Sequence, residues 1–179
     1  MARPLFLDRD GVINADSPDY IKSVAEWRPL PGSLEAIARA TRVGFTVVVV
    51  TNQSGIARGL FSEGDLEAIH AEMRRRVEEL GGRLAGVFHC PHAPQAGCEC
   101  RKPEPGLIER ACRTLGLEAV GAPLVGDRES DLEAARRAGC RPILVRRQDD
   151  TRGGPAMDLA VDVTVVPDLA AAVDALISA

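Results

Sequence analysis

The sequence predicts an α/β fold in which helices cover both faces of a doubly wound, mostly parallel sheet. Three observations support this prediction. Short β-branched runs alternate with helical segments along the chain, as in successive βαβ units. The run FTVVVV lacks the polar residue at every second position that a half-exposed strand would have. This indicates a strand buried on both faces. The 179 residues show no linker and no internal repeat, so we expect one domain over residues 1–179.

The first half of the chain alternates strand, helix, strand and helix. Leu34, Ile37 and Ala38 recur at helical spacing, which indicates one apolar helix face. Ser62 is a typical N-cap, and two glycines after Leu80 are typical of a helix end. The elements expected here are a strand ending at Asp8, a helix from Ser33 to about Val43, a strand ending at Val50 and a helix from Ser62 to about Leu80.

The second half continues the alternation. We expect strands in LAGVFHC, PLVGD, RPILV and VDVTVV, and a closing helix in DLAAAVDALIS. Two further helices are expected, from about Pro105 to Leu115 and from Asp131 to Ala138. The polar, Gly-rich stretch from Gln148 to Pro155 predicts a surface loop.

Composition limits the partners. The net charge of −4 is spread over the chain, which argues against a nucleic-acid surface because such surfaces carry basic patches. No apolar run is long enough to span a bilayer, and the first residues do not resemble a signal peptide. We therefore expect a cytoplasmic protein without membrane or nucleic-acid partners. The oligomeric state stays open, with a monomer as the default.

The motif FLDRDGV places Asp8 and Asp10 two residues apart at the end of an apolar strand. Side chains at i and i+2 of an extended chain share a face, so both carboxylates can face the crevice at the strand end. Adjacent carboxylates repel each other unless a cation neutralises them, and oxygen ligands that also meet phosphate favour Mg²⁺. Taken alone, the pair is equally typical of a turn or a helix N-cap.

Three later segments offer matching chemistry. Thr51 begins TNQSG, whose hydroxyl, amide and backbone N–H groups suit phosphate oxygens. The ammonium of Lys102, which follows Arg101, can neutralise a phosphate and hold a carboxylate. Asp127 ends a strand and can complete a metal site, while Asp131 braces that site or caps the next helix. Singly, these segments are also typical of a polar turn, a solvated basic pair and a helix cap.

The segment CPHAPQAGCEC concentrates Cys90, His92, Cys98 and Cys100 within a short loop. Three thiolates and one imidazole form a closed tetrahedral Zn²⁺ ligand set, which predicts a structural zinc rather than a catalytic one. The alternatives are reduced surface cysteines or a disulfide. A bound zinc folds a loop that lacks secondary structure, and this loop leads directly to Arg101.

The remaining cysteines and histidines have simpler interpretations. Cys112 and Cys140 are expected to be buried and to act as small hydrophobes. We expect His70 on the surface of the long helix and assign no role to His89.

The order of these motifs resembles the haloacid dehalogenase superfamily of phosphatases. That resemblance implies that Asp8 attacks phosphorus to form an aspartyl-phosphate and that Asp10 protonates the leaving oxygen and then activates water. It also implies that Thr51 and Lys102 hold the phosphoryl group, and that Asp8, the Asp10 carbonyl and Asp127 bind Mg²⁺. The short interval between Asp10 and Thr51 predicts that no large cap domain covers the crevice.

Within that superfamily, FLDRDGVIN, TNQSGIARG, CPH…CxCRKPEPG and GDxxxD resemble the D-glycero-D-manno-heptose 1,7-bisphosphate 7-phosphatases of bacterial lipopolysaccharide heptose synthesis. The resemblance implies removal of the 7-phosphate, leaving heptose 1-phosphate and phosphate. The substrate-binding residues expected from it are Asp16, Asp19, Tyr20, Asn52, Gln53, Ser54, Arg101, Lys102 and Arg128.

Two other functions stay open. The interval between His92 and Cys98 is shorter than in some heptose enzymes and approaches that of histidinol-phosphate phosphatases. A histidine-pathway phosphatase is therefore the first alternative. A catalytically silent zinc-binding interaction protein with the same fold is the second. The sequence does not fix the preference between α and β anomers.

Overall fold

A computed structural model describes residues 2–147 and 163–178. Within them the strands form one parallel sheet in the order β3-β2-β1-β4-β5-β6, which confirms the predicted fold class. The loop expected from Gln148 to Pro155 lies outside the described residues. The elements are β1 (Arg3–Leu7), η1 (Val24–Glu26), α1 (Ser33–Arg42), β2 (Phe45–Asn52), α2 (Glu63–Glu79), β3 (Leu84–Cys90), η2 (Pro94–Ala96), α3 (Gly106–Leu115), β4 (Pro123–Gly126), α4 (Glu129–Arg137), β5 (Arg141–Val145), β6 (Thr164–Val166) and α5 (Leu169–Ile177).

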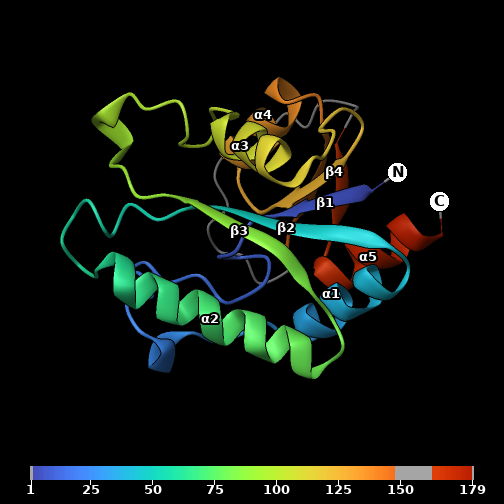
Figure 1. Ribbon diagram of the computed structural model, residues 1–179, viewed down its shortest axis with the longest axis horizontal. Helices are drawn as coiled ribbons and strands as arrows, with labels where there is room; N and C mark the ends of the chain where they lie inside the picture. Colours follow the sequence, from blue (N-terminus) through green and yellow to red (C-terminus); the bar gives the residue numbers. More distant parts are fainter. Residues whose placement is uncertain (1, 148–162, 179) are drawn as a thin grey trace.

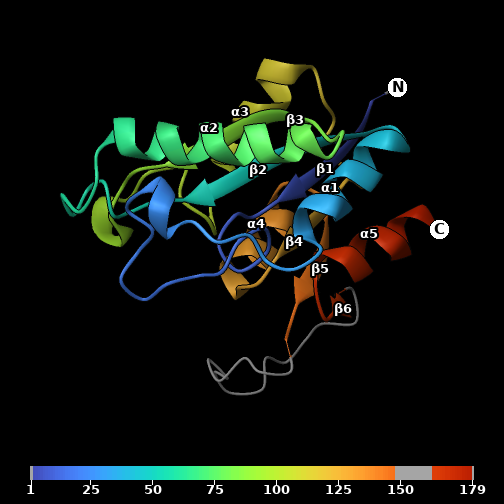
Figure 2. The same ribbon diagram turned by 90° about the horizontal axis from the view of Figure 1, so that it is seen from below.

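Helices cover the sheet on both sides. Helices α1, α2 and α5 pack on one face, and α3 and α4 on the other (Figures 1 and 2). Successive residues of β2 point to opposite faces of the sheet. Val47 and Val49 belong to one core cluster, whereas Val48 and Val50 belong to the other. Because side chains alternate along a strand, both sets must be apolar. This explains the unbroken valine run.

The chain reverses direction across the sheet at β1. It first builds β2 and β3 on one side of β1 and then crosses to β4 on the other side. The carboxyl ends of β1, β2 and β4 therefore meet at a switch point, where doubly wound proteins bind their ligands. Between β1 and α1 the chain forms loops and only the short η1, so the expected absence of a large cap is confirmed.

Helix α4 begins earlier than the sequence pattern suggested. We expected a helix from Asp131 to Ala138, but it begins at Glu129. Asp131 is its third residue, and its Oδ2 accepts the backbone N–H groups of Asp127 and Arg128 at 3.1 Å each. A carboxylate at this position satisfies N–H groups that the first turn leaves without partners. Asp131 thus caps the helix from inside it.

The expectation of a surface His70 is wrong. His70 is 1% exposed, because it lies on the apolar stripe of α2 formed by Leu66, Ile69, Met73 and Val77. These residues recur at helical spacing, and His70 falls between them on the same face. The pattern was therefore present in the sequence.

The two cysteines outside the Cys/His loop differ in burial. Cys140 is buried, as expected, and its Sγ lies 3.3 Å from the carbonyl oxygen of Ala119. Cys112 on α3 is only half-buried and packs at the edge of the core beneath that helix.

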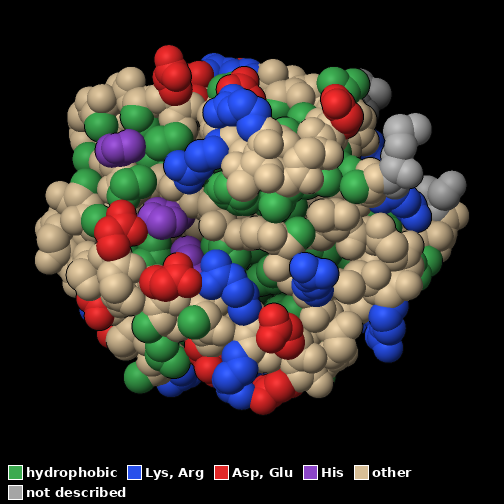
Figure 3. Space-filling model, in the orientation of Figure 1, with side chains coloured by type: hydrophobic (Ala, Val, Ile, Leu, Met, Phe, Trp, Pro, Cys, Tyr) green, Lys and Arg blue, Asp and Glu red, His purple; other side chains and the backbone are tan. Residues whose placement is uncertain are grey.

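The surface carries charges of both signs. On the face shown in Figure 3, basic and acidic side chains are interspersed rather than gathered into a single patch. Among residues 2–147 and 163–178, no helix has the length and apolar content needed to span a bilayer.

Candidate active site

A cleft of about 1380 Å³ lies over the switch point. It exceeds the roughly 300–1,000 Å³ of pockets that enclose a small molecule, which agrees with the lack of a cap. The loops that follow β1, β2 and β3 and the start of α4 provide its walls. The predicted site residues that line it are Asp8, Asp10, Asp16, Tyr20, Thr51, Asn52, Gln53, Ser54, Arg101, Lys102, Arg128 and Asp131.

A buried ammonium occupies the floor of the cleft. Lys102 Nζ lies 2.8 Å from Asp8 Oδ1 and 2.7 Å from Asp131 Oδ1, and it also donates to the carbonyl oxygen of Val50 at 2.8 Å. The side chains of Lys102 and Asp131 are each 1% exposed. One cation therefore connects the residue after β1, the last part of β2 and the first turn of α4.

Burial and the neighbouring charges shift the pKa values of both Asp8 and Lys102. Burial raises the pKa of Asp8 to about 7, with Asp131 and Asp10 adding to the rise and Lys102 opposing it. Burial lowers the pKa of Lys102, but the two carboxylates outweigh it and raise that pKa overall. The lysine therefore stays charged, whereas Asp8 needs more positive charge to be fully ionised at neutral pH.

The donor set fits a divalent cation. Asp8, Asp127 and Asp131 offer carboxylate oxygens within 4.8 Å of one another. Asp131 is already engaged, since Oδ2 accepts two backbone N–H groups and Oδ1 meets Lys102. Asp8 and Asp127 are therefore the carboxylates suited to a metal. Once Asp8 is ionised, the three carboxylates and one ammonium carry a net charge of minus two, which one divalent ion would neutralise.

Gly11 allows the two metal-suited segments to approach. Its φ is +85°, a conformation that favours glycine. A Cβ added there would lie 2.0 Å from Oδ2 of Asp127. The glycine in FLDRDGV therefore serves both the turn after β1 and the space for Asp127.

The carboxylate of Asp10 is held by four side-chain hydrogen bonds. The Arg9 guanidinium donates through Nε to Oδ1 and through Nη2 to Oδ2, both at 3.1 Å. Asn14 Nδ2 donates to Oδ1 and Gln53 Nε2 to Oδ2, each at 2.8 Å. Neither Arg9 nor Asn14 was assigned a role from the sequence, although both stand in the motif FLDRDGVIN.

Polar residues at the end of β2 orient their neighbours. The Asn52 amide donates to the carbonyl oxygen of Lys102 at 3.0 Å and accepts its backbone N–H at 3.1 Å. This pair of bonds fixes the backbone that carries the lysine. The hydroxyl of Thr51 accepts from Gln53 Nε2 at 3.0 Å and is almost fully buried.

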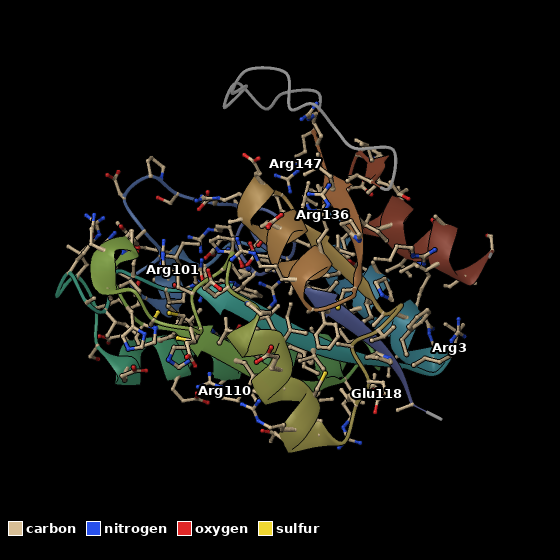
Figure 4. The ribbon with its side chains drawn as sticks, turned by 90° about the horizontal axis from the view of Figure 1, so that it is seen from above. Arg3, Arg101, Arg110, Glu118, Arg136 and Arg147 are labelled. Carbon is tan, nitrogen blue, oxygen red and sulfur yellow. The ribbon has the colours of Figure 1, made fainter. Side chains whose placement is uncertain are left out.

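Two predicted arginines line the cleft from different segments of the chain. Arg101, labelled in Figure 4, donates to the carbonyl oxygen of His92 at 3.3 Å. Arg128 pairs with Asp16 at 2.7 Å. The 16–20 loop, which carries Asp16, Asp19 and Tyr20, therefore meets the start of α4. Burial lowers the pKa of Arg128, but Asp16, Asp127 and Asp8 together raise it above its ordinary value, so the side chain stays a cation.

Two further arginines line the cleft and were missed. Arg147, also labelled in Figure 4, reaches in from the end of β5 and donates to the carbonyl oxygen of Gly11 at 3.0 Å. Arg58 lies over the ring of Tyr20, 5.9 Å from its centroid. Arg58 lies within TNQSGIARG, which gave a signal for it; Arg147 lies after the motifs, and nothing marked it.

Asp19 lies away from the other predicted substrate residues. Its side chain is exposed and does not line the main cleft. Its backbone N–H bonds Oγ of Ser17 at 3.2 Å in a tight turn. The turn places Asp19 beside a neighbouring hollow of about 390 Å³, with Lys22 and Glu26.

The four Cys/His side chains converge as a metal site requires. His92 Nδ1 lies 3.4 Å from Cys90 Sγ and 3.3 Å from Cys100 Sγ. Cys98 Sγ lies 3.6 Å from each of the other sulfurs. With Zn–S bonds of about 2.3 Å, the edge of a zinc tetrahedron is about 3.8 Å, close to these spacings. Cys98, a member of this cluster, also lines the cleft.

Two family models match the sequence. The model described as HAD-hydrolase-like matches residues 99–172. The model described as polynucleotide kinase 3 phosphatase matches residues 7–128 and thus more than half of the chain.

Curated relatives and solved structures agree over nearly the whole length. The D-glycero-beta-D-manno-heptose-1,7-bisphosphate 7-phosphatase of Pseudomonas aeruginosa is 49% identical over 175 residues, 97% of each chain. The crystal structure of the Bordetella bronchiseptica D,D-heptose 1,7-bisphosphate phosphatase, complexed with magnesium and phosphate, has 46% identity and a TM-score of 0.89 over 98% of each chain. The corresponding Burkholderia thailandensis structure has 37% identity and a TM-score of 0.75 over 99% of each chain.

We predict that Lys102→Met destabilises the metal-free protein by about 3–5 kcal/mol, because it leaves two buried carboxylates without their cation. Urea unfolding in EDTA measures this. Arg137→Met is the matched control, since it breaks ion pairs with Glu104 and Glu133 at the surface and should hardly change stability. Equal losses in the two variants would contradict the role given to the buried ammonium.

Proposed function

The chain belongs to the haloacid dehalogenase-like phosphatases, within the family of heptose bisphosphate phosphatases, and on this premise we propose that it hydrolyses the 7-phosphate of D-glycero-β-D-manno-heptose 1,7-bisphosphate. The products are heptose 1-phosphate and phosphate. The observation that carries the chemistry is the 2.8 Å contact between Lys102 and Asp8 at the strand ends, with Asp10 two residues further on. The names of the aligned relatives support the substrate and the β anomer.

The reaction divides into two displacements. An Asp8 oxygen forms a bond to phosphorus as the bond from phosphorus to the sugar oxygen breaks, and Asp10 gives that oxygen its proton. Water then attacks the aspartyl-phosphate, the bond from phosphorus to Asp8 breaks, and Asp10 takes the proton from water. Thr51 and Lys102 hold the phosphoryl oxygens throughout, where charge must be stabilised.

Asp8, Asp127 and the backbone carbonyl of Asp10 would hold Mg²⁺. A bound Mg²⁺ supplies positive charge that stabilises the transferring phosphoryl group. The net charge of minus two on the carboxylates and Lys102 supports this assignment, as does the magnesium named in the Bordetella structure. Asp131 acts behind them by holding Lys102 and the backbone at Asp127.

The rest of the cleft suits the sugar and its second phosphate. Arg101 and Arg128 provide cations on two walls, and Arg fits phosphate oxygens in a bidentate way. Asn52, Gln53 and Ser54 line the same cleft and offer amide and hydroxyl groups to the sugar. From the 16–20 loop, Asp16 and Tyr20 complete the wall, and Asp19 would contact only the part of a substrate that extends beyond the cleft.

We assign a structural Zn²⁺ to Cys90, His92, Cys98 and Cys100. Their mutual spacing supports a closed tetrahedral site. The metal would fold the loop that carries Arg101 and the lysine beside it. Thiolate ligands persist where thiols stay reduced, so we place the protein in the cytoplasm. Because one chain provides the complete set of proposed residues, we propose that it works as a monomer with a single domain.

The alternatives are less well supported. The aligned relatives bear the heptose name rather than a histidinol one. A catalytically silent protein would not need to keep Asp8, Asp10 and Lys102 together at one cleft that a substrate can enter.

We predict that the wild-type protein with Mg²⁺ releases phosphate from the β-1,7-bisphosphate faster than from the α anomer or histidinol phosphate. Asp8→Asn should lower this rate at least about 10³-fold, since it removes the nucleophile of a covalent mechanism. Phosphate release over a panel of the three substrates measures both. Faster turnover of histidinol phosphate would instead favour the histidine-pathway function.

We predict one zinc per chain in protein purified without chelators, measured by elemental analysis. Cys98→Ser should bind less zinc and unfold at a lower temperature, because metal binding contributes directly to folding. Cys112→Ser is the control, since Cys112 lies outside the cluster. Zinc-free wild-type protein with unchanged thermal stability would refute the zinc assignment.

A further inference from the structure

A buried arginine stands between the proton-carrying carboxylate and a histidine that the proposed mechanism does not use. We propose that His70 is a positioning residue for the reaction: it fixes the far end of the Arg9 guanidinium, and Arg9 in turn fixes the direction of the Asp10 carboxylate. This inference rests on the proposed function, because it gives Asp10 the proton-transfer role.

Because Arg9 is buried, its guanidinium needs hydrogen-bond acceptors within the protein. Arg9 is 0% exposed, so each guanidinium N–H without an acceptor costs free energy. One edge of the guanidinium is satisfied by Asp10. On the other side, Nη1 lies 3.3 Å from Nε2 of His70. Within residues 2–147 and 163–178, no other side chain is recorded as an acceptor for Arg9, so His70 is the second anchor of a buried cation.

The hydrogen bond with Arg9 determines which ring nitrogen of His70 carries the proton. Arginine only donates hydrogen bonds, so Nε2 must be the acceptor, and the ring proton sits on Nδ1. Burial, and then the charge of Arg9, lower the pKa of His70 to about 2. The imidazole is therefore neutral over the whole range in which a phosphatase works, and the acceptor is always available.

Arg9 needs a second anchor because it grips the residue next to it in the chain. Its long side chain must turn back to place a planar fork on the Asp10 carboxylate, and four side-chain torsions are free to move unless the far end is held. Proton transfer requires heavy atoms about 2.6–3.2 Å apart, and a displacement of about 1 Å can cost about a hundredfold in rate.

The bonds from Asn14 and Gln53 limit the size of the effect. Both amides donate to Asp10 at 2.8 Å, and neither hydrogen bond depends on His70. They would keep the carboxylate near its place when the histidine is replaced. We therefore expect a partial loss, about tenfold, from the 10²–10⁴-fold that general acid–base catalysis supplies.

The test compares two leaving groups. A sugar oxygen needs a proton as it leaves, whereas the nitrophenolate of 4-nitrophenyl phosphate leaves without one. The ratio kcat/KM covers steps through the first displacement. His70→Leu should lower kcat/KM for the heptose bisphosphate about tenfold and leave that for the aryl phosphate within about twofold. His70→Gln, which restores an acceptor oxygen, should recover most of the loss.

Met73→Leu is the matched control, because Met73 lies on the same buried stripe of α2 but contributes no acceptor. It should leave both values unchanged. An equal fall in kcat/KM for both substrates in His70→Leu would show a merely structural role and overturn the proposal. Unchanged kcat/KM values for both substrates would also overturn it.

Two outcomes are kept distinct from these. If His70→Leu does not fold, Arg9→Lys provides the same comparison, since it keeps the charge and loses the fork; a selective loss on the sugar substrate supports the proposal, and an equal loss overturns it. A wild-type protein that hydrolyses neither phosphate contradicts the proposed function itself.

Discussion

The ammonium of Lys102 is the contact on which the geometry of the cleft depends. It lies within 2.8 Å of Asp8, Asp131 and the carbonyl oxygen of Val50, and these belong to three separate elements. A buried cation among carboxylates is costly to disrupt, because removing it leaves uncompensated charge. Asn52 holds the backbone of the lysine through its N–H and carbonyl groups. The proposed divalent metal would neutralise the negative charge that the carboxylates have in excess of the lysine.

The central site residues were predictable from sequence because few physical rules determine them. Parallel strands end at one edge of the sheet, so Asp8, Thr51 and Asp127 had to meet once their strands were recognised. The apolar runs that mark those strands arise because each is covered by helices on both faces. The convergence of the four Cys/His side chains was also predictable, since Cys90, His92, Cys98 and Cys100 stand at short spacing in one loop; that they bind zinc stays a prediction.

Other features needed the three-dimensional structure. The contact between Arg9 and His70 joins the loop after β1 to the middle of α2, and no local pattern encodes which helix packs on which loop. The sequence shows Arg9 within a motif and His70 on an apolar helix face, but it does not show that the two side chains are in contact. Arg147 enters the cleft from the end of β5, far from the motifs along the chain. Asp19 was predicted with its loop, yet a tight turn places its side chain outside the cleft.

The central claim is that Asp8 carries the phosphoryl group. It is tested most directly by mass spectrometry of Asp10→Asn after reaction with 4-nitrophenyl phosphate and rapid acid quench. Nitrophenolate leaves without a proton, while hydrolysis of the intermediate lacks its base, so phosphorylated protein should accumulate. The account predicts one added phosphoryl group, confined to the peptide that contains Asp8 and absent when Asp8 is also changed to Asn. A phosphoryl group on another residue, such as His89 or His92, would contradict it, as would phosphate release without any labelled protein.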